Sequence, residues 1–175
     1  MPSPILADAF GHHIWASLRV LDACGTLDDA QLATTVPGTY GSIMDTLRHL
    51  VDADVFYLDV LLGRAEPFDR DASDIPMLRA IMEAHDPVWK QLVAAEMDGS
   101  TDVVEIEDNG DESHAPLGVR LAQALHHGTD HRSQVCTALT SLGIEPPSID
   151  VWDFGALDGR VFSKPSRTGD PAVHP

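Results

Sequence analysis

The stretch that says most about this chain is His126-His127-Gly128-Thr129-Asp130-His131-Arg132-Ser133-Gln134. It lies within residues 116–142, where apolar side chains recur at helical spacing and a glycine follows the last of them. His127 and His131 are four residues apart, so on a helix they stack on one face with Cβ atoms about 5–6 Å apart. Two imidazoles at that distance can share one divalent ion. The stretch predicts a long helix that carries two ligands of a metal site.

Two segments nearer the N-terminus also have the pattern of long helices. Residues 4–24 begin with a proline, which the first turn of a helix tolerates, and a glycine follows them. Residues 42–63 begin with Ser42 as a good N-cap, with Asp45 three residues later, and end in a glycine. The second segment carries an apolar stripe formed by Ile43, Leu47, Leu50, Val51, Leu58 and Leu61.

The third predicted helix, residues 75–97, contains Pro87, which should kink the helix or split it. After it, residues 102–106 alternate in the manner of a strand. Asn109-Gly110 is a strong hairpin turn signal before a return strand through His114. The order of elements predicts an all-α fold: a four-helix bundle with a small two-stranded ribbon between the third and fourth helices. Such bundles commonly hold metals with side chains on facing helices.

The length and composition suit one compact domain. The chain has 175 residues, 43% of them apolar, which is enough for a single buried core. We expect the domain to span residues 1–157. A loosely held tail, residues 158–175, should follow, because that stretch is rich in glycine, proline and polar residues.

The charge balance excludes one large class of partners. The formal net charge is −17, from 11 basic and 28 acidic residues, and the basic residues form no cluster. Nucleic-acid affinity depends on basic groups that displace counterions from phosphates, so we expect no nucleic-acid partner. The N-terminal residues lack a basic leader with an apolar segment behind it, and no apolar stretch approaches the roughly 18 residues of a membrane span. We expect a cytoplasmic protein that acts on a small molecule, without a membrane partner.

The two cysteines, Cys24 and Cys136, are too few for a disulfide framework and too far apart for a zinc ribbon. We expect both to be reduced thiols in the core or near the surface. Cys136 is five residues past His131 and projects away from it around the helix, which makes it a poor ligand for the same ion.

Two histidines do not make a metal site, so a third ligand must come from another helix. His13 lies near the edge of the apolar stripe of the first helix, and His85 is a weaker candidate on the third. His49 lies away from the most apolar side of the second helix, so periodicity alone does not select it. The paired histidines flank the apolar stripe of their own helix. An ion that they held would lie at the mouth of the bundle with one side open to solvent.

Two stretches resemble the DinB-like superfamily: Leu47-Arg48-His49-Leu50-Val51-Asp52-Ala53-Asp54 and His127-Gly128-Thr129-Asp130-His131-Arg132-Ser133-Gln134. A third, Gly143-Ile144-Glu145-Pro146-Pro147-Ser148-Ile149-Asp150, is similar to the stretch after the last long helix of that family. The resemblance covers residues 4–157. It implies a bundle of four helices that carries nickel or zinc on three histidines, with His49, His127 and His131 as the ligands. Many members of the family form pairs, so the resemblance also implies a homodimer.

Several polar side chains are candidates for orienting these ligands. Asp54 falls in the middle of an apolar stripe, where an unpaired carboxylate costs several kcal/mol or takes up a proton. It could hold the free N–H of a ligand histidine, or form a buried ion pair with Arg132. Asp45, one turn before His49, competes for the first role. Gln134, next to the paired histidines, is a further candidate.

A three-histidine site with an open position acts on whatever fills that position. A cation lowers the pKa of bound water toward about 7 and supplies hydroxide, whereas a bound thiol loses its proton beside an electrophile. Characterised members of the superfamily include transferases and isomerases that use bacillithiol or mycothiol. The resemblance therefore favours a transferase that activates a low-molecular-weight thiol. The alternatives are a metal-dependent small-molecule hydrolase and a non-catalytic stress-response protein that binds metal or serves as a dimer module.

The sequence speaks against several other activities. Gly128 follows His127 where His-Glu-x-x-His peptidases carry their catalytic base. The chain has no phosphate-binding glycine loop with a following lysine, no nucleophile elbow and no dinucleotide fingerprint. Trp152 and Phe154, after the fourth helix, either line the mouth of the site or cap the end of the bundle.

Overall fold

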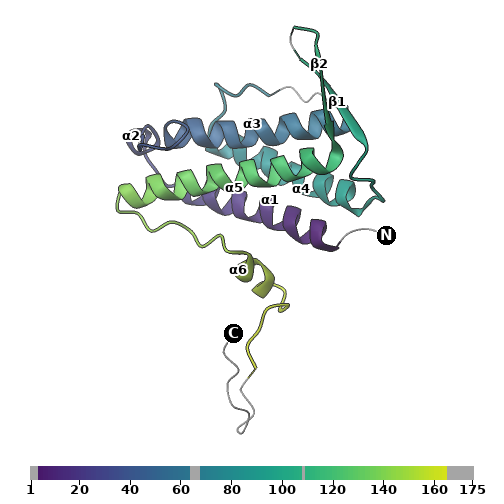
Figure 1. Cartoon of the computed structure of the whole chain (residues 1–175). Coiled ribbons are helices and arrows are strands. Elements are labelled where there is room, and N and C mark those ends of the chain that lie inside the picture. Colours follow the sequence, from purple (N-terminus) through teal and green to yellow (C-terminus); the bar gives the residue numbers. More distant parts are fainter. Residues whose placement is uncertain (1–3, 64–67, 108, 165–175) are drawn as a thin grey trace.

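The computed structural model describes residues 4–63, 68–107 and 109–164, and four long helices dominate this part of the chain (Figure 1). The elements follow in the order α1 (Pro4–Cys24), α2 (Asp29–Leu32), α3 (Ile43–Leu62), α4 (Ile75–Ala94), β1 (Asp102–Ile106), β2 (Glu112–Pro116), α5 (Leu117–Ser141) and α6 (Val151–Ala156). Helices α1 and α3 each pack against both α4 and α5. The predicted four-helix bundle with a ribbon between the third and fourth long helices is confirmed.

The ends of α3 follow the capping signals in the sequence. The Ser42 hydroxyl accepts a hydrogen bond from the N–H of Asp45 at 3.0 Å, and the Asp45 carboxylate accepts one from the N–H of Ser42 at 3.2 Å. This is a capping box, which satisfies two backbone donors at the start of the helix. At the other end, Gly63 has a φ of 63°, a left-handed conformation that glycine adopts without a steric penalty. These two caps define the length of the helix that carries His49.

Helix α4 runs through Pro87 as one helix, so the expected split is wrong. It ends at Ala94, whereas the prediction continued to residue 97. Met82, His85 and Trp89 lie on both sides of the proline, and all three are buried. Their packing against the neighbouring helices offsets the backbone hydrogen bond that the proline removes.

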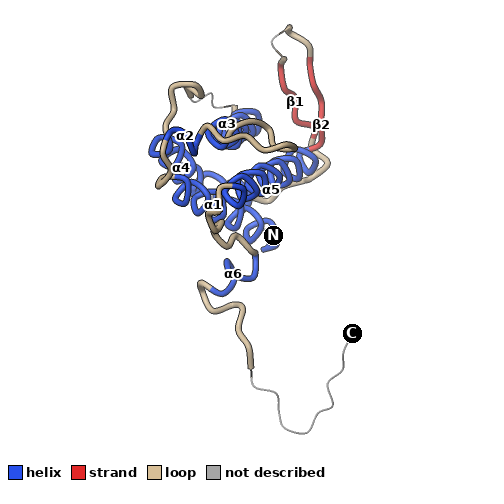
Figure 2. The backbone as a smooth tube through the Cα atoms, turned by 90° about the vertical axis from the view of Figure 1, so that its left-hand side faces the viewer, coloured by secondary structure: helices blue, strands red, loops and turns tan. Residues whose placement is uncertain are grey.

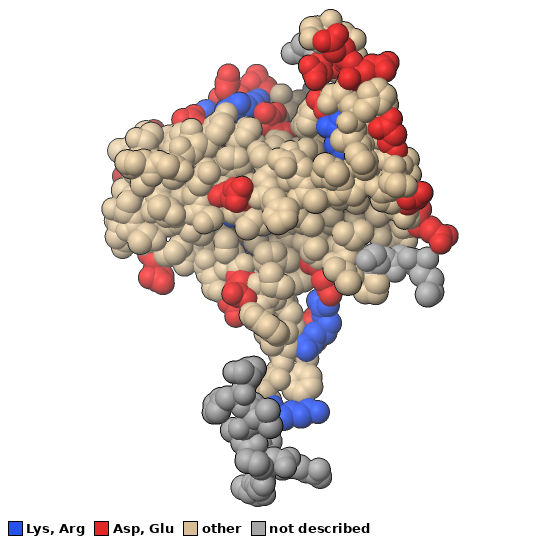
Figure 3. Space-filling model, in the orientation of Figure 1, with Lys and Arg blue, Asp and Glu red and all other residues tan. Residues whose placement is uncertain are grey.

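The ribbon projects sideways from the bundle, near one end of the long helices (Figure 2). Its strands pair antiparallel, with Asp102 opposite Pro116 and Ile106 opposite Glu112. Gly110 has a φ of 88° in the turn, which agrees with the Asn-Gly signal. Acidic side chains gather on this ribbon, as Figure 3 shows on the face drawn there. The ribbon thus adds to the negative charge of the molecule at one end of the bundle.

Two short helices, α2 and α6, were not predicted. Asp28 caps α2 in a capping box with Gln31, and Asp150 accepts a hydrogen bond from the N–H of Trp152 at the start of α6. Both helices are too short to show an apolar period in the sequence. Of the predicted tail, residues 158–164 form neither helix nor strand, and residues 165–175 lie outside the described residues.

The core contains buried apolar side chains from all four long helices, among them Phe10, Ile14, Leu21, Leu47, Val51, Leu78, Met82, Val135 and Leu139. A group of polar side chains around Asp54 is buried in their midst. Among the described helices, none combines the length and the apolar character needed to cross a bilayer.

Candidate metal centre

Three histidines from two helices meet at one point. The Nε2 atom of His127 lies 3.1 Å from Nε2 of His49 and 3.1 Å from Nε2 of His131. In a tetrahedral site with metal–nitrogen bonds of about 2.0–2.1 Å, the ligand nitrogens are about 3.3 Å apart. The ligand atoms that the three residues offer lie within 4.8 Å of one another. These three histidines could therefore hold a divalent metal ion.

The packing of α3 against α5 brings the three imidazoles together. His131 is buried, and His49 and His127 are half-buried at the edge of this contact. His49 lies off the most apolar side of α3, which is why the apolar period did not select it. The family resemblance of the stretch around it selected His49, and its partners on α5 show that the side chain points into the cluster.

Gly128, between the paired histidines, allows α1 to approach α5 closely. A Cβ atom on Gly128 would lie 2.4 Å from Cε1 of His13 and 2.7 Å from its Nδ1. Carbon atoms do not approach to such distances without a shift of one of them, so any larger residue would displace the ring of His13. Gly128 therefore has a packing role, the close contact of α5 with His13 on α1, which the sequence motif did not indicate.

Gln134 identifies the nitrogen of His131 that carries the proton. The backbone N–H of Tyr40 donates a hydrogen bond to Oε1 of Gln134 at 3.0 Å, and the same oxygen lies 3.0 Å from Nδ1 of His131. An oxygen only accepts here, so Nδ1 of His131 must be the donor. In the neutral ring, Nε2 then carries a lone pair that points at the other two histidines. This is the arrangement that a metal ligand requires.

Burial favours the neutral form of His49 and of His127 in the cluster. It lowers the pKa of His49, and the neighbouring His131 and Arg70 lower it further. The pKa of His127 falls to about 4 because of burial and the proximity of His131 and His49. A neutral imidazole is the form that binds a metal ion. The Nδ1 atom of His49 is buried and has no hydrogen-bond partner among the described residues.

Aromatic side chains surround the cluster. The ring of Tyr40 stacks on His49, with ring centroids 4.1 Å apart and an angle of 5° between the planes. Tyr57 meets His127 edge-on at 6.1 Å. Arg70 donates a hydrogen bond to the Tyr40 hydroxyl at 3.2 Å, which places one positive charge beside the cluster. Tyr40 lies in the loop before α3, and no motif in that loop pointed to a role at the site.

A comparison with protein families assigns the chain to a family. The model of the DinB family matches residues 1–160. The chain belongs to the DinB family. No curated protein matches it. The resemblance of residues 47–54 and 127–134 to the DinB-like superfamily predicted a helical bundle and a group of three histidines. The structure contains both.

Asp54 does not touch the histidine cluster of this DinB-family chain, so the expectation that it holds a ligand histidine is wrong. Its Oδ1 accepts a hydrogen bond from Nε2 of His13 at 2.9 Å, and its Oδ2 accepts one from Nδ1 of His85 at 2.5 Å. The indole N–H of Trp89 donates to both oxygens, at 3.1 and 3.2 Å. Burial raises the pKa of Asp54, but the hydrogen bonds that it accepts from His13 and His85 outweigh burial and bring the pKa below its ordinary value.

His13 and His85, the other candidates for the third ligand, thus bind Asp54 and do not join the cluster. Arg132 donates a hydrogen bond from Nη1 to Nδ1 of His13 at 3.1 Å. Because Nδ1 of His13 accepts, Nε2 must carry the proton that it donates to Asp54. Arg132 and Asp54 therefore form a buried ion pair bridged by a neutral imidazole, and not the direct pair considered from the sequence.

Asp45 and the two cysteines also lie apart from the cluster. Asp45 accepts hydrogen bonds from the backbone and the hydroxyl of Ser42, so it caps α3 and does not orient His49. Cys24 is buried in the core, and this burial raises its pKa to about 12. Burial also raises the pKa of Cys136, which lies on another face of α5. Of the predicted orienting residues, Gln134 is the one that contacts a histidine of the cluster.

Trp152 and Phe154 do not line the mouth of the cluster. Phe154 packs on α1, with its ring centroid 5.9 Å from that of His12 and 5.6 Å from that of Trp15. Trp152 is 71% exposed. After α5 the chain turns back along α1, as the hydrogen bond of 2.8 Å between His12 and the carbonyl oxygen of Ile149 shows. This path carries both aromatic residues away from α3.

Proposed function

We propose that this DinB-family protein is a metal-dependent transferase that joins a low-molecular-weight thiol to a small electrophile. His49, His127 and His131 would bind the ion, nickel or zinc. The observation that carries the proposal is the convergence of three imidazole nitrogens on one point. When bound, the metal supplies a positive charge that favours the thiolate form of a thiol.

The number of ligands favours catalysis over a structural role. Structural zinc sites are closed by four protein ligands, whereas catalytic sites leave a position for water or substrate. In the part of the chain that the structure describes, the group of ligand atoms consists of the three histidines, without a cysteine or carboxylate as a fourth member. A fourth position is therefore available to a small molecule.

The properties of the cysteines support an external thiol. Cys24 is buried in the core, and its raised pKa keeps it protonated at neutral pH. Cys136 lies on a different face of α5 and also has a raised pKa. A thiolate is the nucleophilic form of a thiol. In the proposed reaction a small thiol therefore supplies the sulfur. It loses its proton to solvent, forms a bond to the electrophilic carbon and displaces a leaving group that departs with its electron pair.

The surroundings of the cluster favour an electrophile with an apolar or aromatic body. Tyr40 and Tyr57 flank the histidines, and Phe56 on the same helix as Tyr57 is 41% exposed. Aromatic rings bind flat apolar molecules by stacking and edge-on contacts. Arg70, beside the Tyr40 hydroxyl, adds a cation that can attract a negative group on the substrate.

Metal analysis of the protein purified without chelator tests the ligand set. We expect about one nickel or zinc ion per chain in the wild type, and a strong loss of metal in His49→Ala and His131→Ala. His126→Ala is the matched control, because His126 is exposed on the same helix as His131. Stoichiometric metal in either ligand variant would contradict the site, as would an equal loss in the control.

Activity is then measured with the metal-loaded protein. Cysteine, glutathione and coenzyme A, together with sugar-linked cysteine thiols, are screened against monochlorobimane as a generic electrophile. Metal-dependent consumption of one thiol class supports the proposal. Full metal content combined with hydrolysis of small esters and no thiol consumption would replace the transferase with a hydrolase. Full metal content with neither activity would favour a non-catalytic metal-binding role.

A further inference from the structure

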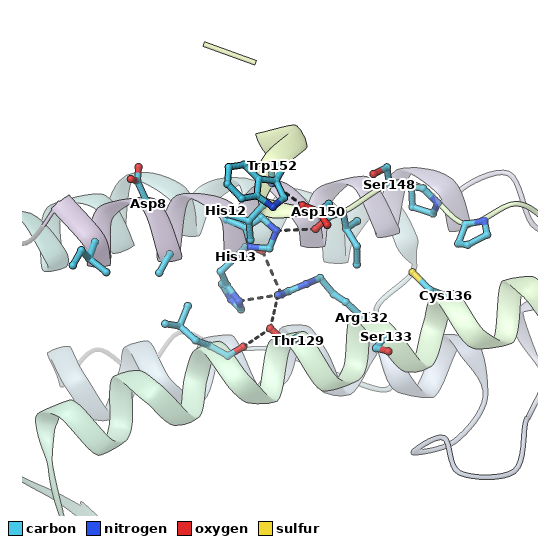
Figure 4. A pocket seen from close by; sticks show the side chains of 17 residues that line it. Asp8, His12, His13, Thr129, Arg132, Ser133, Cys136, Ser148, Asp150 and Trp152 are labelled. Atoms are coloured by element: carbon cyan, nitrogen blue, oxygen red, sulfur yellow. Dashed lines mark hydrogen bonds between the residues drawn. The ribbon is translucent and has the colours of Figure 1, made fainter. Parts of the chain in front are cut away.

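A second cavity lies on a face of α5 that does not carry the histidine cluster. It has a volume of about 1070 Å³ and is bounded by α1, by α5 and by the segment of residues 146–152 that follows α5. Figure 4 shows Arg132 reaching from α5 toward α1 in this space. His12 and Trp152 lie across the cavity from α5. A cavity of this volume is large enough for a small organic ligand, since such pockets measure about 300–1,000 Å³.

The walls of the cavity are mainly apolar. They include Ala9 of α1, Leu125 of α5, and Ile149 and Trp152 of the segment after α5. Trp152 is 71% exposed, so it stands at the rim, where its ring can cover a ligand. Apolar walls of this kind bind a hydrocarbon chain or ring by removing its surface from water.

Arg132 supplies a positive charge inside this apolar cavity, although the residue is only 2% exposed. Its Nη1 donates hydrogen bonds to Nδ1 of His13 and to the hydroxyl of Ser17, and its Nη2 donates to the hydroxyl of Thr129. Among the described residues, Nε of Arg132 has no acceptor within hydrogen-bond distance, and Nη2 has one acceptor for two N–H groups. The N–H of Nε and one N–H of Nη2 are therefore available to an acceptor from outside the chain.

The acidic side chains that line the cavity are already engaged. Asp8 accepts a hydrogen bond from Arg160 at 2.5 Å, and Asp150 accepts one from the backbone N–H of Trp152 at 2.7 Å. His12 contacts the carbonyl oxygen of Ile149, and burial lowers its pKa. Arg132 is thus the group in this cavity that combines a permanent charge with free donors.

We propose that this cavity binds a small amphiphilic carboxylate. Its two oxygens accept hydrogen bonds from Nε and Nη2 of Arg132, and its apolar part lies against Ala9, Leu125 and Trp152. A guanidinium matches the planar geometry of a carboxylate, and hydrogen bonds between the two are charge-assisted. The site does not depend on the proposed metal centre, because a different face of α5 forms it.

Isothermal titration calorimetry of the full chain at physiological ionic strength tests the proposal, with decanoate as the probe. The head group of the probe is varied and Arg132 is left unchanged, because a substitution of Arg132 would also disturb the buried polar group around Asp54. We expect decanoate to bind with one site per chain. Decan-1-ol should bind about tenfold more weakly, since it lacks the charged head group, and decyltrimethylammonium should not bind.

Variants locate the site. Ala9→Phe fills the cavity from α1, and Ser133→Phe narrows it from α5, so each should abolish decanoate binding. Ala7→Phe is the matched control, because Ala7 is exposed on α1 and does not line the cavity. His127→Ala removes a member of the histidine cluster and should leave decanoate affinity unchanged. Circular dichroism establishes that each variant keeps its helical content.

Three results would overturn the proposal. Equal affinities for decanoate and decan-1-ol would show that Arg132 plays no part. Unchanged binding by both filled variants would place the probe elsewhere. Loss of decanoate binding in His127→Ala would mean that the carboxylate binds at the histidine cluster.

Discussion

Gln134 links the loop before α3 to the histidine cluster, and it holds His131 in the tautomer that leaves Nε2 free. Gln134→Leu removes the acceptor for Nδ1 of His131. Losing such a contact typically reduces metal affinity about 10- to 100-fold. We expect that reduction in a competition titration against a chromophoric chelator. Gln123→Leu, on the exposed side of the same helix, should retain the wild-type affinity. Equal affinities for the two variants would refute the orienting role of Gln134.

Gly128 is expected to tolerate no side chain. In Gly128→Ala the new methyl group would collide with the ring of His13, which is held by Arg132 and Asp54. Overpacking of this kind lowers the free energy of unfolding by about 1–3 kcal/mol. Urea denaturation followed by circular dichroism measures it. Ser133→Ala, an exposed change on the same helix, should stay within about 0.5 kcal/mol of the wild type. If Gly128→Ala has the same free energy of unfolding as the wild type, α1 can move away from α5 without a loss of stability.

The cap of α3 is a separate determinant of stability, because this helix carries both His49 and Asp54. Ser42→Ala removes the hydroxyl that accepts from the N–H of Asp45. Loss of an N-cap lowers the free energy of unfolding by about 0.5–2 kcal/mol. The same denaturation experiment detects it. Thr137→Ala removes an exposed hydroxyl in the middle of α5 and serves as the control. If it lowers the free energy of unfolding as much as Ser42→Ala does, the effect of Ser42→Ala is not due to capping.

The four long helices and both strands were predictable because their signals are local. Proline and glycine mark the ends of helices, capping residues mark their starts, and the apolar period marks the face that is buried. The split considered at Pro87 does not occur, because the contacts that hold α4 together across the proline come from other helices. The short helices α2 and α6 were not predicted, because a helix of one or two turns is too short to show an apolar period.

The buried polar group around Asp54 joins the whole bundle. Asp54 belongs to α3, His13 to α1, His85 and Trp89 to α4, and Arg132 to α5. The pKa of Asp54 lies below its ordinary value in the folded protein, while in the unfolded chain it is about 3.9. The unfolded chain therefore takes up a proton before the folded protein does. The resulting stabilisation is present above about pH 4 and is lost as the pH falls toward the folded-state pKa.

Asp54→Asn tests this in metal-free protein, which removes any effect of metal release at low pH. At pH 7 the variant should be less stable by about 3–5 kcal/mol, because the buried Arg132 loses its counter-charge. Its unfolding free energy should also fall less steeply than that of the wild type between pH 5 and pH 3. Asp59→Asn, half-exposed on the same helix, should behave as the wild type. Identical pH profiles for Asp54→Asn and the wild type would exclude this carboxylate as the source of acid sensitivity.

The amino-acid sequence was enough to establish the bundle, the ribbon and the pairing of His127 with His131, because all of these depend on residues close together in the chain. Four-residue spacing on one helix needs no knowledge of the other helices. The family resemblance selected His49 from the sequence, but its position opposite that pair depended on how the helices pack. The partners of Asp54 and the closeness of His13 to Gly128 depended on the same packing. Each of these contacts joins residues far apart in the chain, and a rotation of one helix about its axis would remove them without altering any local signal.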